Sequence, residues 1–153
     1  MMITALLIAH GLLAVALLGA LTHQAVSVLR PSTSGKSFVD RYRGVNTNVF
    51  SGAVVVLFMI TALGGGLLYP AYRVEVRTVL EDLQLRAANG VFEAKEHFVA
   101  VGLGLLPAYA LFWRAPLNAA YAGVRRFTTV ALAAIVWWSY LVGHVLNNIR
   151  GLQ

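Results

Sequence analysis

The sequence predicts an all-α fold, an integral membrane bundle of four transmembrane helices. Of the 153 residues, 59% are hydrophobic and only 12% are charged, about half of the roughly 25% that is usual in soluble domains. A soluble core of this size could not bury so much apolar surface, so we expect lipid to surround most of the chain.

Four apolar segments carry this prediction, and each is close to the ~20 residues that cross ~30 Å of hydrocarbon as a helix. They cover residues 3–28, 49–72, 91–113 and 127–147 of a single domain that spans 1–153. Helices are expected because a lone strand would leave its backbone groups unpaired in lipid. The first segment is too long for the core of a signal peptide, so we expect it to be retained.

The net charge of +6 would suggest a nucleic-acid partner in a soluble protein. Here the basic residues lie in short loops between the apolar segments, so topology explains them and no nucleic acid is expected. An excess of Lys and Arg marks the cytoplasmic side of a membrane. The first loop holds Arg30, Lys36, Arg41 and Arg43 against Asp40, the third holds Arg114, Arg125 and Arg126, and the second is balanced. We therefore expect a cytoplasmic (inner) membrane with both termini outside.

The stretch 90–98 places four ionisable residues at the start of the third segment: Glu93, Lys95, Glu96 and His97. Charged groups at the edge of a membrane span are costly and often functional. Lys95 is either a lysine whose amine reaches the headgroups or a partner for the propionate of a haem. The sequence leaves both possibilities open.

Three of the four histidines are expected at similar depth, in the outer half of the membrane. At ~1.5 Å per residue, His10, His97 and His144 all fall there, while His23 lies alone near the inner end of its helix. The small residues that continue the face of His97 leave room for a flat group or a neighbouring helix. Each histidine could instead be a hydrogen-bonding residue between helices, and we favour this role for His23.

Neutral imidazole is a common ligand of haem iron and of copper. Two histidines from facing helices would suit a six-coordinate haem b, with His97 as first choice and His10 or His144 opposite. Three histidines at one depth could hold copper instead. The chain contains no cysteine, which excludes thiolate ligands and disulfides.

Four helices, a histidine early in the first and a lysine at the start of the third resemble two groups of membrane proteins. These are the HemJ-type protoporphyrinogen oxidases and the CopD-type copper-resistance proteins. The HemJ resemblance implies that His10 binds haem b and that Lys95 is the matching lysine. The chain departs from that pattern at Glu96 and His97, which follow the lysine.

The sequence therefore predicts a haem b protein that transfers electrons with quinone, or a membrane subunit of a respiratory redox complex. One alternative is a HemJ-like oxidase of protoporphyrinogen. The other is an accessory subunit without a cofactor that packs against larger membrane proteins, which the short loops favour.

Overall fold

The computed structural model describes residues 1–29, 38, 47–114 and 117–151. The charged residues of the first loop, on which part of the topology prediction depends, lie outside the described residues. They are Arg30, Lys36, Asp40, Arg41 and Arg43.

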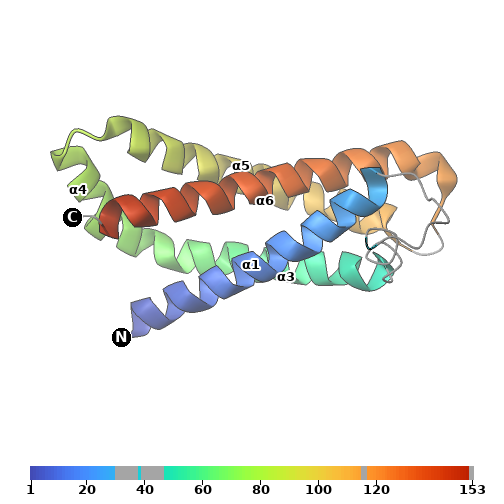
Figure 1. Ribbon diagram of the computed structural model, residues 1–153, viewed down its shortest axis with the longest axis horizontal. Coiled ribbons are helices and arrows are strands. Elements are labelled where there is room, and N and C mark those ends of the chain that lie inside the picture. The colour runs from blue at the N-terminus through green and yellow to red at the C-terminus, as the bar shows by residue number, and fades with distance from the viewer. Residues whose placement is uncertain (30–37, 39–46, 115–116, 152–153) are drawn as a thin grey trace.

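Four long helices make up most of the structure (Figure 1): α1 (Met2–Leu29), α3 (Thr47–Ala71), α5 (Arg86–Phe112) and α6 (Ala122–Gly151). No strand occurs among the described residues, and the predicted all-α class is confirmed. By length and composition, the ranges Met2–Leu29, Phe50–Asp82 and Ala119–Asn147 can each cross a membrane. The 27 residues of α5 are long enough, but its first half carries the charged stretch.

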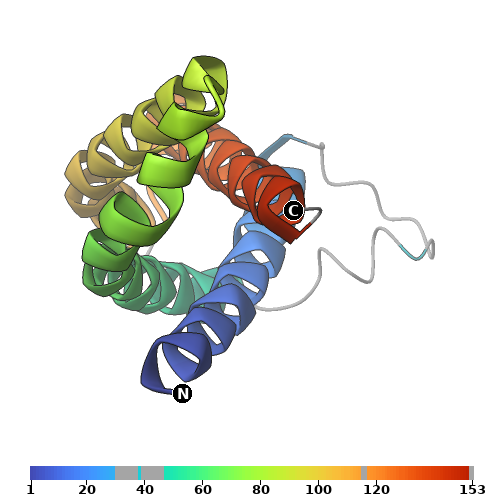
Figure 2. The same cartoon turned by 90° about the vertical axis from the view of Figure 1, so that its left-hand side faces the viewer.

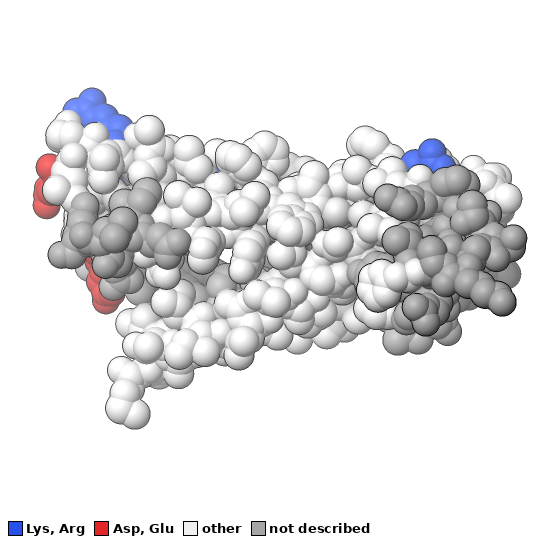
Figure 3. All heavy atoms as spheres, in the orientation of Figure 1, with Lys and Arg blue, Asp and Glu red and all other residues white. Residues whose placement is uncertain are grey.

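The helices are arranged so that α1 packs against both α3 and α6, and α5 packs mainly against α6. Helices α3 and α5 pack less closely against each other than the other neighbouring pairs do. An end-on view shows the four helices arranged around a common axis (Figure 2). The start of α1, the end of α6 and α4 (Arg77–Asp82) lie together at one end of the bundle (Figure 1). On the face seen in Figure 3, charged side chains gather at the two ends of the bundle and leave an uncharged band between them, as a membrane requires.

The segment 73–89, which the sequence places in the second loop, is mostly helical. A π-helix (Tyr72–Val76) continues α3 directly into α4. The Tyr72 ring stacks on Phe92 at 3.5 Å between centroids, and its hydroxyl donates to Asn89 Oδ1 at 3.1 Å. These contacts hold the segment against α5.

The tightly packed core lies in the half of the bundle away from the chain termini. It draws on the second half of α1 and α5 and the first half of α3 and α6, and its fully buried members include Leu21, Val54, Tyr109 and Leu132. Trp113 Nε1 donates to Thr129 Oγ1 at 2.9 Å within it. We call this half the packed end, and the half with the termini the cavity end.

Candidate cofactor cavity

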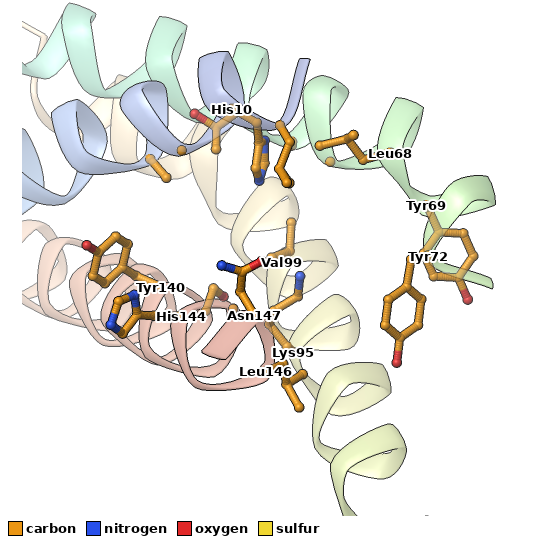
Figure 4. A pocket seen from close by; sticks show the side chains of 18 of the residues that line it. His10, Leu68, Tyr69, Tyr72, Lys95, Val99, Tyr140, His144, Leu146 and Asn147 are labelled. Carbon is orange, nitrogen blue, oxygen red and sulfur yellow. The ribbon is translucent and has the colours of Figure 1, made fainter. Parts of the chain in front are cut away.

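The cavity end contains a partly open cavity of about 580 Å³ between the four long helices (Figure 4). This volume lies within the ~300–1,000 Å³ of ordinary ligand sites. Three of the predicted site residues line it from three helices: His10 from α1, Lys95 from α5 and His144 from α6. Most of the remaining wall is apolar or aromatic, so the space suits a hydrophobic ligand with a few polar groups.

The floor of the cavity is the Phe58 side chain, which is 3% exposed and belongs to both the cavity wall and the core. A Cβ on Gly102 of α5 would lie 2.5 Å from the Phe58 ring and 3.4 Å from Ile135. The missing side chain at Gly102 therefore lets Phe58 extend across from α3. Phe58, together with Leu17 and Val136, lies where the cavity meets the packed end.

The His10 ring projects into the cavity and rests against a glycine stretch of α3. A Cβ on Gly64 would lie 3.2 Å from His10 Nδ1, and one on Gly65 would lie 3.4 Å from His10 Cε1, whereas one on Gly66 would meet nothing within 4 Å. Gly64 and Gly65 therefore make room for the imidazole.

Three residues that line the cavity each have a buried side-chain atom with no hydrogen-bond partner among the described residues: His10 Nδ1, Thr61 Oγ1 and Ser139 Oγ. A buried polar atom without a partner costs about 1–3 kcal/mol. Such atoms are usually satisfied by water or a ligand.

Charged and aromatic groups meet where α5 begins. Lys95 Nζ lies 2.7 Å from Glu96 Oε1 and 4.2 Å from the centroid of the Phe92 ring. The Lys95 side chain is only 15% exposed. His10, Lys95 and Glu96 all line the same cavity.

The other two histidines of the outer group differ in their positions. His97 is exposed, does not line the cavity, and its Nδ1 lies 2.7 Å from the Glu93 carbonyl oxygen. His144 lines the cavity, and its ring lies nearly parallel to Tyr140 at 6.2 Å. Figure 4 shows these two rings side by side on α6, across the cavity from His10.

His23 lies at the packed end, 2% exposed, with its ring stacked on Phe50 at 4.4 Å. Among the described residues, no three His, Asp or Glu side chains are placed to hold one metal ion together. The geometry thus joins His10, His144 and Lys95 in one cavity, while His97 and His23 lie outside it.

Two residues of the site were not singled out from the sequence, Thr61 and Ser139. A hydroxyl inside an apolar segment is a weak signal, because serine and threonine in helices usually bond to the carbonyl four residues before. Thr22, Ser27 and Thr128 do so here. Only the structure shows that Thr61 and Ser139 do not.

Comparisons with protein-family models, with curated proteins and with solved structures find no match to this chain. The fold and the cavity therefore define its class directly, as an all-α helical bundle of membrane type with a partly open cavity between its helices.

Proposed function

We propose that the cavity binds a haem b and that the protein transfers electrons in the membrane, with quinone or within a larger redox complex. The proposal is based on the position of His10, whose imidazole points into a largely apolar cavity of about 580 Å³. Bound haem would supply one-electron redox chemistry there.

The surroundings of His10 fit a ligand of iron. With the proton on Nδ1, which faces Gly64 of α3, Nε2 keeps the lone pair that would bind a metal. Gly64 and Gly65 leave room for the ring against α3, and this packing would orient His10 if it held the iron.

The ammonium group of Lys95 supports the same proposal at another point. Its side chain lines the cavity, is mostly buried and is partly neutralised by Glu96 at 2.7 Å. A carboxylate of the ligand could replace or share this partner, and a charge-assisted hydrogen bond would hold it. His144, which lines the cavity across from His10, would be the candidate for a second protein ligand of the iron.

The test is the spectrum and haem content of protein expressed with ample haem and purified in detergent. We expect one haem for each chain, lost in His10→Ala and kept in His97→Ala, since only the former ring enters the cavity. If haem is lost only in His97→Ala, then His97, the ligand preferred from the sequence, is the better assignment. Colourless wild-type protein without metal would refute the haem proposal and favour the accessory subunit.

A second candidate is the oxidation of a porphyrinogen, which the HemJ resemblance implies. The observation that favours it is that His10 and Lys95, the two matching residues, line the same cavity. Oxidation of protoporphyrinogen by the purified protein, dependent on both residues, would place this activity ahead of electron transfer.

We also propose that both termini lie outside an inner membrane. Both ends of the chain lie at the cavity end, where the charges of 73–89 are balanced, and Arg114, Arg125 and Arg126 belong to the opposite end. The excess of positive charge favours the cytoplasm for that opposite end. A reporter fused after Gln153 should be active only outside the cytoplasm, and activity inside would reverse this orientation.

A further inference from the structure

The first half of α1 and the second half of α6 both border the cavity, and the space between them shows how a ligand could enter. We propose that the ligand is an amphipathic acid that enters laterally from the bilayer between α1 and α6 and turns its carboxylate toward Lys95. This inference rests on the proposed function, because haem, a flat apolar ring with carboxylates on one edge, is the member of this class used in the test.

Two glycines show where the cavity opens. Gly11 of α1 and Gly143 of α6 both line the cavity, and a Cβ on either would meet nothing within 4 Å. On α3, by contrast, a Cβ on Gly64 or Gly65 would contact the His10 ring. At this level α1 therefore stays against α3, while its side toward α6 has free space.

Hydrogen bonds join α1 to α6 further along, in the second half of α1. Trp137 Nε1 donates to Thr22 Oγ1 at 3.1 Å, and Arg126 Nε donates to the Val28 carbonyl oxygen at 3.2 Å. Toward the chain termini the two helices diverge, both from the side (Figure 1) and end-on (Figure 2). The opening of the cavity therefore lies between the first half of α1 and the second half of α6.

The two helices that border this opening are apolar. Residues 1–29 and 127–149 contain no Asp, Glu, Lys or Arg. Ile8, Leu12 and Val15 of α1 line the cavity and are each more than half exposed. In a helix able to cross a membrane, such side chains face the acyl chains of lipids. A molecule dissolved in the bilayer can thus reach the cavity without passing a charged group.

The charged residues of the cavity wall lie on the other side. Because α1 packs against α3 and α6, and α5 packs against α6 and more loosely against α3, the α3–α5 side lies across from the opening. Lys95 and Glu96 of α5, and Glu75 of the π-helix that follows α3, line the cavity from there.

Lys95 is the group on that side that would attract an acid. Its side chain is 15% exposed, and Nζ lies 2.7 Å from Glu96 Oε1. An ammonium group has three N–H donors, so it can hold a second carboxylate beside Glu96 through a charge-assisted hydrogen bond. An apolar opening on one side and a buried cation on the other fit a ligand with an apolar body and an acidic end.

The experiment measures how fast haem enters and leaves the protein in lipid vesicles, for the wild type, Gly11→Phe and Gly143→Phe. Each substitution adds a ring at the opening, where the Cβ has space. The matched control is Gly19→Phe on α1, whose Cβ also meets nothing within 4 Å but which does not line the cavity. Haem is delivered from haem-loaded vesicles, and released haem is captured by an excess of a soluble haem acceptor.

We expect entry and release of haem to slow several-fold in Gly11→Phe and Gly143→Phe, with unchanged final haem content. A blocked route slows both directions alike, whereas a cavity made smaller would lose affinity and release haem faster. The control should match the wild type in both rates.

A reversible closure separates a blocked route from a damaged fold. Because the chain contains no cysteine, a pair made by Gly11→Cys and Gly143→Cys can be joined selectively with a thiol-cleavable bismaleimide. Joining the pair should slow the entry of haem, and cleavage with a reducing thiol should restore the rate in the same molecules.

The carboxylate contact is tested with Lys95→Gln, using haem and its dimethyl ester as probes. Haem should leave the variant roughly tenfold faster than it leaves the wild type, as for one lost hydrogen bond between charged groups. The ester has no carboxylate, so its release rate should be the same from both proteins.

Each contrary result has a distinct meaning. Wild-type rates in both phenylalanine variants and in the joined pair would overturn the lateral route and leave the haem proposal intact. Equal effects of Lys95→Gln on haem and on its ester would refute the carboxylate contact. Wild-type protein that takes up no haem would refute the proposed function and this inference together.

Discussion

The same four helices form both ends of the bundle, but they pack tightly at one end and leave a cavity at the other. At the packed end, large side chains fill the interior, and Tyr109, Leu21 and Leu132 are completely buried. At the cavity end, the same helices leave about 580 Å³ open. Close packing is the usual state of a protein interior, so the open end is the part that needs a functional explanation.

The two histidines of α1 show what this difference means for chemistry. His23 lies against Phe50 in the packed end, whereas His10 lies against glycines beside open space. Both belong to one apolar helix, and their environments come from the neighbouring helices. A histidine becomes a candidate ligand here because of what packs around it.

The largest expected effect is on haem content, which should depend on His10 and not on His23. His10→Ala should remove the bound haem, while His23→Gln should keep it, because His23 lies at the packed end, outside the cavity. Haem content after purification measures the contrast. Loss of a full haem for each chain in His23→Gln would place the site at the packed end and overturn the comparison.

A smaller effect, on the free energy of unfolding, is expected from substitutions where the cavity meets the packed end. Gly102→Ala places a Cβ 2.5 Å from the Phe58 ring, and overpacking of this kind costs about 1–3 kcal/mol. Gly104→Ala, two residues further along α5, meets nothing within 4 Å and gains helix propensity, up to about 1 kcal/mol.

Thermal unfolding in detergent should therefore rank Gly104→Ala above the wild type and Gly102→Ala below it. Equal stability of the two variants would mean that Phe58 is not fixed as the floor of the cavity.

The smallest effect, on haem affinity, is expected at the glycines of α3 that pack against the His10 ring. Gly64→Ala brings a Cβ to 3.2 Å from Nδ1 and must displace the ring by a few tenths of an ångström. Haem affinity should fall by roughly tenfold, as for other residues that orient a metal ligand. Gly66→Ala is the control, since its Cβ has open space. Matching haem dissociation rates in the two variants would show that these glycines do not orient His10.

The sequence determined the class of the fold because composition and segment length act locally. An apolar segment of ~20 residues must be helical in lipid, whatever its neighbours are. The four helices accordingly lie where the apolar segments predicted them, although α5 begins at Arg86 and α6 at Ala122, earlier than expected. The ends shift because polar residues at the membrane surface extend a helix without adding to the apolar pattern.

The tertiary structure alone decided which residues share the cavity. The predicted depths brought His10, His97 and His144 to one level, but the direction of a side chain depends on how its helix is rotated in the bundle. That rotation follows from contacts such as Phe58 against Gly102 and Tyr72 against Phe92, which join distant parts of the chain. For this reason the sequence could suggest His10 and Lys95, but it could not reveal Thr61 and Ser139 or the glycines that hold the His10 ring.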